Sequence, residues 1–239
     1  SPTLQKNFNV KIIGGDDVSI ERVPYQISLQ YNGDHFCGGS IISQTYIVTA
    51  AHCTYEQDPA ALSIRAGTAI RGDGGQVISV SKVHDHPNFN RFTADYDIAV
   101  LELETPLTLG RFVAPIVLPS ENQTWPAGTE VFVSGWGALS EDAATFPTNL
   151  QGVALEIVDE AACVSAYGMV YLVTERMLCA GVNEGGKAAC HEDSGGPLAV
   201  DGVLGGVVSW GLGCGRPGIP GVYANVPVLR DFIKNVTGI

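Results

Sequence analysis

Three short segments of the chain carry side chains that could together perform nucleophilic chemistry. They are Thr49-Ala50-Ala51-His52-Cys53, Asp95-Tyr96-Asp97-Ile98-Ala99 and Asp193-Ser194-Gly195-Gly196-Pro197. A serine hydroxyl is a poor nucleophile until a neutral imidazole can accept its proton. That imidazole in turn needs a buried carboxylate to fix its tautomer and to stabilise its charged form. A histidine, an aspartate or a serine alone would mean little, but the three segments together are specific.

The elements that must position these segments are predicted to be strands. Short apolar runs, many of them β-branched, recur along the chain and end at Gly, Pro, Asn or Asp, which is typical of all-β barrels and sandwiches. The runs cover residues 25–31, 40–50, 77–83, 98–103, 131–135, 153–158, 198–210 and 221–226. Helix is expected mainly over residues 228–236, where apolar residues can share one face, with a second short helix over residues 159–167.

The composition excludes several classes of function. Of the 239 residues, 45% are hydrophobic and 16% charged, and the net charge is −12, so we expect a packed globular protein. The chain lacks the basic face that phosphate backbones or anionic lipids attract, so neither nucleic acid nor a membrane is an expected partner. The sequence also predicts no transmembrane helix and no signal peptide, since no apolar run approaches about 18 residues.

The cysteines favour disulfide bonds over a metal site. No C-x-x-C pair with an accompanying histidine is present, so structural zinc is not expected, and the even number indicates an oxidising compartment. Spacing alone does not choose among the pairings that six cysteines allow. Asn-X-Thr sequons at Asn122 and Asn235 agree with secretion and predict a glycoprotein.

Taken together, the three segments resemble the chymotrypsin and trypsin family of secreted serine endopeptidases. The resemblance runs from Ile12-Ile13-Gly14-Gly15 to the terminal helix. It implies two six-stranded antiparallel β-barrels with the active site between them and a short C-terminal helix, in agreement with the all-β pattern. It also implies that Ser194 is the nucleophile, His52 the base that takes its proton, and Asp97 the residue that orients the imidazole.

The chain is weakly divided where prolines and a glycine interrupt the apolar pattern. We place an inter-barrel crossing at residues 119–127. The N-terminal barrel region is then expected over residues 12–118, and the C-terminal barrel with its helix over residues 128–239.

At each histidine, a purely structural or solvated role competes with the functional interpretation. His52 could be a satisfied core histidine, with Asp97 a turn residue and Ser194 a loop hydroxyl, but the family's order of all three argues against this. His84 and His86 receive the opposite interpretation, because their polar surroundings predict that they are solvated, although a metal pair there is left open. No cofactor or metal is expected. The stretch that matches the calcium loop of many trypsins is short and carries only one carboxylate.

The resemblance implies three disulfide bonds. One would brace His52, and another would tie the Ser194 loop to a wall of the substrate pocket. On the chain-entropy model, closing loops of this size stabilises a fold by about 3 kcal/mol each. The expected pairs are Cys37 with Cys53, Cys163 with Cys179, and Cys190 with Cys214.

The expected substrate pocket departs from that of trypsin. Ala188-Ala189 stand where trypsin-like members have an Asp-Ser, so a buried substrate Lys or Arg would lack a counter-charge, at a cost of several kcal/mol. An open apolar slot that prefers Phe, Tyr, Leu and Met is therefore predicted, and one segment of its wall should pair with the substrate backbone as an added strand. The expected substrate-binding residues are Ala188, Ala189, His191, Ser209, Trp210, Gly211 and Gly221.

A second departure lies in the predicted oxyanion hole. Glu192 replaces a glycine whose N–H, together with the N–H of Ser194, would bind the oxyanion. The amide donor survives, but a nearby carboxylate opposes a developing negative charge, and the loss of one donor costs about 100- to 1,000-fold in rate. We expect retained activity with narrowed substrate choice and weaker binding of bulky protein inhibitors. The alternative is a severely weakened enzyme.

The N-terminal residues resemble an activation peptide. Lys11 precedes Ile12 as a basic residue precedes the family's activation cleavage, so residues 1–11 are expected to be a propeptide and the chain an inactive zymogen. Because the pocket is apolar, the enzyme should cut after Lys11 poorly by itself. A separate trypsin-like activating protease is therefore expected.

The resemblance also implies what cleavage does. The new Ile12 ammonium would insert into the second barrel and pair with Asp193, because a buried charge needs a partner. Before cleavage, His35 and Ser28 are expected to hold Asp193 in an alternative pair.

Two functions remain open at this stage. The first is a secreted, monomeric serine endopeptidase that acts on peptides or proteins through an acyl-enzyme and meets protein inhibitors. The second is a weakly active or inactive homologue that acts by binding partners, which Glu192 favours and the complete set of His52, Asp97 and Ser194 opposes.

Overall fold

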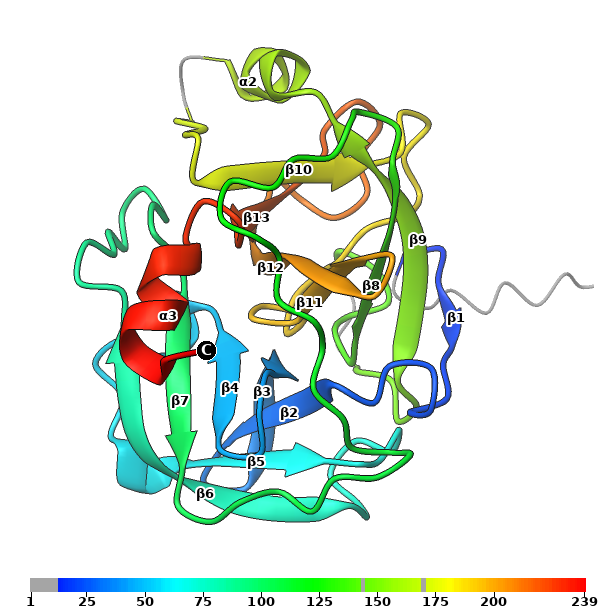
Figure 1. The fold of residues 1–239 in the computed structure, drawn as a ribbon. Coiled ribbons are helices and arrows are strands. Elements are labelled where there is room, and N and C mark those ends of the chain that lie inside the picture. The colour runs from blue at the N-terminus through cyan, green and yellow to red at the C-terminus, as the bar shows by residue number, and fades with distance from the viewer. Residues whose placement is uncertain (1–12, 143–144, 169–170) are drawn as a thin grey trace, which may run out of the picture.

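The first half of the chain forms a closed barrel. The computed structural model describes residues 13–142, 145–168 and 171–239, and in Figure 1 the first barrel is the lower one. All its strand pairings are antiparallel, in the order β2-β3-β4-β7-β6-β5, and pairing of β5 with β2 closes it. Its strands are β2 (Gln26–Tyr31), β3 (Asp34–Ile41), β4 (Tyr46–Thr49), β5 (Leu62–Ala66), β6 (Gln76–Asp85) and β7 (Ala99–Leu103).

The second half forms another antiparallel barrel. Its strands follow the order β9-β10-β13-β12-β11-β8, and pairing of β8 with β9 closes the ring. The prediction of two six-stranded barrels is thus confirmed. The strands are β8 (Glu130–Gly135), β9 (Gln151–Val158), β10 (Met177–Gly181), β11 (Pro197–Val200), β12 (Val203–Trp210) and β13 (Gly221–Asn225), and the short β1 (Asp16–Asp17) pairs with the first two residues of β9.

Helices are short and few among the described residues. They are α1 (Ala51–Thr54), the 3-10 turn η1 (Pro59–Ala61), α2 (Glu160–Tyr167) and α3 (Arg230–Thr237). The sequence predicted the last two to within two residues at each end. None of the helices within the described ranges has the length and apolar character needed to cross a membrane.

The predicted strand at residues 198–210 is in fact a hairpin. Asp201 and Gly202 both have positive φ, 48° and 78°, and form the two-residue turn between β11 and β12. Two such residues in succession suit the tight turns that match the twist of paired strands. The apolar run was continuous because both strands of the hairpin are almost wholly buried.

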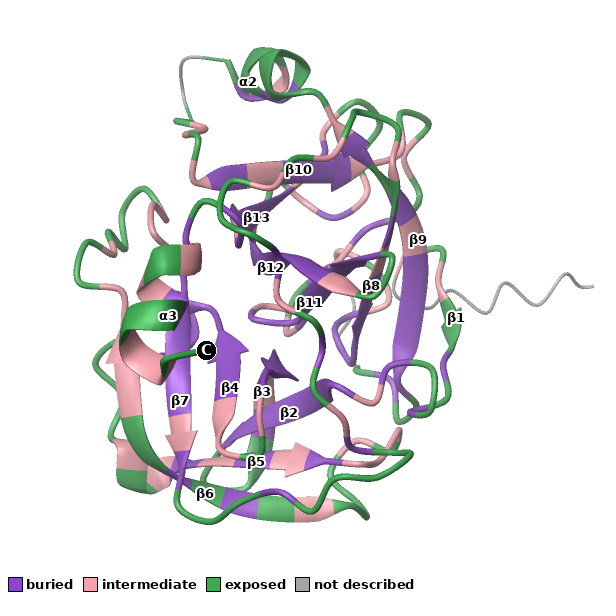
Figure 2. Cartoon of the chain, in the orientation of Figure 1, coloured by how far each residue is buried: buried purple, intermediate pink, exposed green. Residues whose placement is uncertain are grey.

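The apolar core lies inside the barrels, as the burial colours of Figure 2 show. Strands alternate, so that every second side chain of a strand such as β5 points inward and is buried. The barrels also bind one another directly. Ser134 Oγ on β8 donates to Gln26 Oε1 on β2 at 2.7 Å, and both residues are buried. The ends of the strands at this junction carry the candidate site.

Candidate active site

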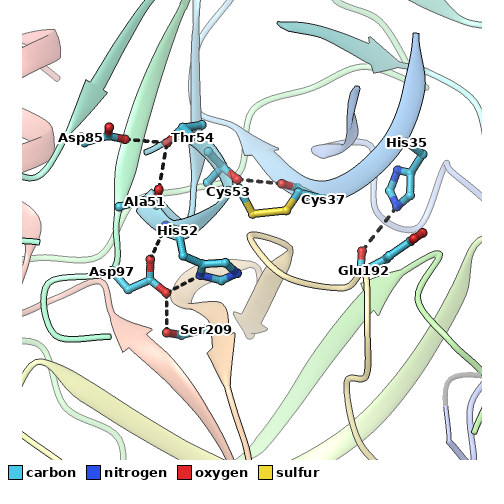
Figure 3. The surroundings of a disulfide bond; sticks show 12 residues. His35, Cys37, Ala51, His52, Cys53, Thr54, Asp85, Asp97, Glu192 and Ser209 are labelled. Atoms are coloured by element: carbon cyan, nitrogen blue, oxygen red, sulfur yellow. Dashed lines mark hydrogen bonds and ion pairs between the residues drawn. A yellow bond between two sulfur atoms is a disulfide. The ribbon is translucent and has the colours of Figure 1, made fainter. Parts of the chain in front are cut away.

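His52 and Asp97 are brought together by the pairing of two adjacent strands. Thr49 at the end of β4 lies opposite Ala99 at the start of β7, so the residues just beyond these ends emerge at the same rim of the first barrel. Asp97 Oδ2 lies 2.7 Å from His52 Nδ1, and Asp97 Oδ1 accepts the backbone N–H of His52 at 2.8 Å (Figure 3). The carboxylate therefore fixes both the position and the tautomer of the imidazole, leaving Nε2 on the far side of the ring.

Asp97 is buried, and a third donor comes from the other barrel. Ser209 Oγ on β12 donates to Asp97 Oδ2 at 2.5 Å, and only 1% of Asp97 is exposed. Burial lowers the pKa of His52, but the hydrogen bond and the charge of Asp97 outweigh burial, so that this pKa lies above its ordinary value. The pair is arranged to accept a proton on Nε2 and to stabilise the resulting imidazolium.

Ser194 reaches this pair from the second barrel. The N–H of Gly38 on β3 donates to the Ser194 carbonyl at 2.8 Å. A Cβ atom on the next residue, Gly195, would lie 2.2 Å from Thr49 Oγ1, so only glycine lets the serine loop pack so closely against the end of β4. Among the described residues the Ser194 hydroxyl has no hydrogen-bond partner. Proton transfer to His52 therefore requires a hydrogen bond from this hydroxyl to Nε2, a contact that commonly tightens only when substrate binds.

The loop before Ser194 is built around a second buried carboxylate. Asp193 is fully buried, and it accepts the N–H of Gly137 at 2.8 Å and the N–H of Cys190 at 2.9 Å. Burial raises the pKa of Asp193 to about 7, and the two amide hydrogen bonds only partly oppose this. The N–H groups of Glu192 and Ser194 donate to no described residue, so both are available to an oxyanion.

His35 does not pair with Asp193 in this structure, which differs from the expected zymogen contact. Its Nδ1 lies 2.7 Å from Ser28 Oγ, as expected for a His35–Ser28 pair, but its Nε2 lies 3.3 Å from the carbonyl of Glu192. Asp193 faces the opposite side, where its carboxyl group lies against Gly137 so closely that a Cβ there would be 2.4 Å from it. Burial, followed by the charge of Arg71, lowers the pKa of His35 to about 4, so the ring is neutral.

The expected activation residues Lys11 and Ile12 lie outside the described residues. Ile13, which follows them, packs against Ala138 and the cysteines of the Cys190–Cys214 bond. Its carbonyl accepts the N–H of Ala188 at 3.2 Å. The chain at residue 13 is therefore already seated in the loops that surround Asp193.

The candidate substrate pocket is a cavity of about 240 Å³ in the second barrel. Ser194 and all seven expected substrate-binding residues line it, and among the described residues no Asp, Glu, Lys or Arg does. Tyr223 also lines it, with a buried hydroxyl that has no hydrogen-bond partner within the described chain. Sequence reasoning did not name Tyr223, because a tyrosine in an apolar strand gives no signal that it faces a pocket.

Three disulfide bonds join the cysteines in the expected pairs. They are Cys37–Cys53, Cys163–Cys179 and Cys190–Cys214. The first fastens α1, which carries His52, to β3 (Figure 3). The third links the Ser194 loop to the segment after β12, on the opposite wall of the cavity.

His84 and His86 are half-buried rather than solvated. The ring of His86 stacks on Tyr96 at 4.6 Å between centroids and contacts Phe232 at 4.8 Å. His84 Nε2 lies 3.6 Å from Glu102 Oε2. Within the described ranges, neither histidine belongs to a group of three metal-ligating side chains, and the two groups found contain disulfide cysteines.

Two antiparallel barrels with a histidine, an aspartate and a serine at their junction define the class of two-barrel serine proteases. The family model described as Trypsin matches residues 12–233. The chain is 42% identical over 232 residues to the vitellin-degrading protease of Bombyx mori, covering 97% of this chain and 88% of that one. It is 44% identical over 230 residues to trypsin 5G1 of Aedes aegypti, with coverage of 96% and 86%, and 44% identical over 232 residues to trypsin delta of Drosophila melanogaster, with coverage of 96% and 90%. The chain belongs to the trypsin family of serine endopeptidases, whose substrates are peptides or proteins.

Proposed function

We propose that the chain is the zymogen of a secreted serine endopeptidase that cuts after large apolar residues. In this proposal Ser194 attacks the substrate carbonyl while His52 takes its proton and then delivers it to the leaving amine. Water then hydrolyses the acyl-enzyme by the same route. The N–H groups of Glu192 and Ser194 bind the oxyanion. The observation that carries the proposal is the hydrogen bond between the buried Asp97 and His52, beside a cavity whose wall includes Ser194.

The preference for apolar side chains rests on the walls of the cavity. Ala188 and Ala189 contribute no charge, so a Phe or Leu side chain would gain about 25 cal/mol per Å² of buried apolar surface. A Lys or Arg side chain would be desolvated without a counter-charge. Two of the relatives above are named trypsin. For the present chain we propose a preference for apolar side chains in place of the Lys or Arg that a trypsin-like pocket takes.

Activation is proposed to occur by cleavage after Lys11, through a trypsin-like protease. The proposal assigns residues 1–11 to a propeptide, with the barrels over residues 12–118 and 128–239 and the crossing at residues 119–127. Support comes from Asp193, which is buried and pairs with no cationic side chain of the described residues. An Ile12 ammonium would supply the missing charge, and the position of Ile13 agrees with such a contact.

A second candidate is a weakly active homologue that works by binding partners. The observation that favours it is the carboxylate of Glu192 next to the proposed oxyanion donors. Secretion, a monomeric state and binding of protein inhibitors belong to the first proposal and would be measured with it.

The deciding experiment is active-site labelling of the cut chain. We would treat the purified chain with trace trypsin, verify the new N-terminus at Ile12, and add an organophosphonyl fluoride, with Ser194→Ala as the control. Rapid labelling of Ser194 supports the enzyme, whereas no labelling supports the partner-binding homologue. If the uncut chain were as active as the cut one, the zymogen proposal would be contradicted. Self-cleavage after Lys11 without trypsin would contradict the proposed apolar pocket.

Substrate profiling then tests the pocket. Peptides with Phe, Tyr or Leu before the cut bond should give a higher kcat/KM than peptides with Lys or Arg. Ala188→Asp should move the preference partly toward basic residues, because it adds a counter-charge to the cavity. A wild-type preference for Lys or Arg would refute the assignment.

A further inference from the structure

Glu192 is held in a backbone conformation that side chains seldom adopt. Its φ is 69°, in the left-handed region, where a Cβ atom crowds the backbone. Its N–H is one of the two proposed oxyanion donors. Such a conformation persists only where the surroundings fix it, so the contacts of Glu192 decide whether its N–H stays in place.

Arg71 provides the contact to the side chain. Its Nη2 donates to Glu192 Oε2 at 2.7 Å, across 121 positions of sequence. The two side chains are only 23% and 26% exposed, which makes this pair less screened than an ordinary surface ion pair.

Arg71 is itself held from several directions. Its Nη1 donates to the Trp136 carbonyl at 3.4 Å, and its guanidinium lies 4.6 Å from the centre of the Phe146 ring. Its backbone N–H donates to the Thr148 carbonyl at 2.8 Å. Arginine is suited to this role because its planar fork can bond a carboxylate and stack on a ring at the same time.

The pair keeps the carboxylate away from the reacting atoms. Glu192 does not line the 240 Å³ cavity, and Figure 3 shows its side chain directed away from His52. On the other side of the residue, His35 Nε2 donates to the Glu192 carbonyl at 3.3 Å, because a carbonyl can only accept. Residue Glu192 is therefore held at its backbone carbonyl by His35 and at its side chain by Arg71.

We propose that Arg71 is a positioning residue that makes Glu192 compatible with catalysis, an inference that rests on the proposed function. It neutralises the carboxylate and holds it outside the cavity, which keeps the Glu192 N–H directed at the oxyanion. Without Arg71 the unpaired carboxylate is free to turn toward the oxyanion and to oppose its charge. The structure thus offers a reason why a glutamate replaces glycine here without closing the oxyanion site.

The test is a double-mutant comparison in the cut enzyme, using a peptide anilide with Phe before the cut bond. Arg71→Met should lower kcat by about 10-fold or more while KM changes less than about twofold, because the loss falls on the transition state. Arg71→Lys, which keeps the charge, should recover part of the rate. In a Glu192→Gly background, Arg71→Met should have no effect on kcat.

A matched control is Arg111→Met. Arg111 also donates to a glutamate, Glu21, and lies over a phenylalanine ring at 4.8 Å, but its side chain is 70% exposed and does not line the cavity. It should leave kcat unchanged. An equal loss from Arg71→Met in the wild-type and Glu192→Gly backgrounds would mean that Arg71 is only structural, and would overturn the proposal, as would an unchanged kcat.

A crystal structure of Arg71→Met separates this proposal from the function on which it rests. If the wild-type enzyme shows no turnover, the proposed function fails, but the position of the Glu192 carboxylate in the variant still decides the role of Arg71. Movement toward the cavity supports the proposal, and an unmoved carboxylate refutes it. If Arg71→Met does not fold, Arg71→Gln is used for the same measurements.

Discussion

Each barrel brings one buried carboxylate to the cleft, and the two carboxylates have very different surroundings. Asp97, beside the first barrel, accepts three hydrogen bonds, one from Ser209 and two from His52, whose ring can carry a positive charge. Asp193, in the second barrel, accepts only two backbone N–H groups, and burial raises its pKa to about 7. One carboxylate has its charged partner within the described chain, and the other does not.

The contrast follows from how each half of the site is built. His52 and Asp97 lie at the ends of paired strands, and a disulfide bond fastens the helix of His52, so this half is positioned mainly by the first barrel, with one hydrogen bond from Ser209 of the second. Ser194 lies in a loop that the Asp193 carboxyl group holds through the N–H groups of Gly137 and Cys190. Under the activation proposed above, the proton-transfer half would be assembled before cleavage and regulation would act on the second barrel.

The largest expected effect is on the half of the site that holds His52 and Asp97. Asp97→Asn in the cut enzyme should lower kcat by about 10⁴-fold, the loss known for the same change in a protease of this family. The amide would favour the wrong imidazole tautomer and would no longer stabilise the imidazolium. Steady-state kinetics across pH should also show the pKa of the essential base falling from its raised value. A loss of less than about tenfold would mean that Asp97 does not orient the base.

The next effect concerns the stability of the uncut chain. Unfolded Asp193 is ionised above pH 3.8, whereas in the folded chain it keeps its proton until about pH 7. The folded state therefore binds more protons between these values, and the free energy of unfolding should fall as pH rises through this range, by at most roughly 4 kcal/mol.

Urea unfolding at several pH values would measure this in an uncut Ser194→Ala background, with and without Asp193→Asn. The difference between the two variants isolates Asp193 from His35, whose pKa of about 4 has the opposite effect, a loss of stability as pH falls below its ordinary value of 6.5. Identical pH profiles would show that the pKa of Asp193 is not raised in the folded, uncut chain, and would contradict this prediction.

In the cut enzyme, Asp193→Asn should lower kcat by about 100-fold. An asparagine cannot pair with the Ile12 ammonium, so the Glu192 and Ser194 N–H groups would lose their fixed arrangement. The rate of labelling by an organophosphonyl fluoride measures this directly. Asp201→Asn, at the exposed turn between β11 and β12, is the matched control and should label at the wild-type rate.

The smallest effect is expected for the hydrogen bond from Ser209 of the second barrel to Asp97. Ser209→Ala removes one of three donors to Asp97 and should lower kcat/KM by about tenfold, since a hydrogen bond to a charged group contributes roughly 1.5–3 kcal/mol. The backbone of β12 is unchanged, so KM should change little. A loss as large as that of Asp97→Asn would contradict the view that the first barrel mainly positions His52 and Asp97, because the second barrel would then contribute equally.

The sequence predicted most of the fold but few of the side-chain contacts between distant segments. Motifs identified His52, Asp97 and Ser194, and apolar runs located most strands, because both signals lie within a few neighbouring residues. Of the barrel strands, β5, β10 and most of β3 were missed. Polar or glycine residues interrupt the apolar pattern of β3 and β5, and β10 is a short strand that is stabilised by partners on both sides.

Contacts between distant segments could not be predicted in the same way. The Arg71–Glu192 pair joins two loops from different barrels, and no local pattern marks either residue as the partner of the other. His35 was expected near the Ser194 loop, but sequence could not show that it would meet a carbonyl instead of the Asp193 carboxylate. Both outcomes depend on side-chain directions that only the packed barrels determine.

Helix α3 has a consequence for how the protein is made. Although it follows the second barrel in sequence, it lies beside the first barrel (Figure 1), and Leu229 and Ile233 belong to the same buried cluster as the β2 and β7 side chains. The strands of the first barrel end at Leu103, so during synthesis their core stays incomplete until the ribosome has added more than a hundred further residues. At usual rates this takes on the order of ten seconds. For that time the apolar side chains of the first barrel that Leu229 and Ile233 later contact remain uncovered.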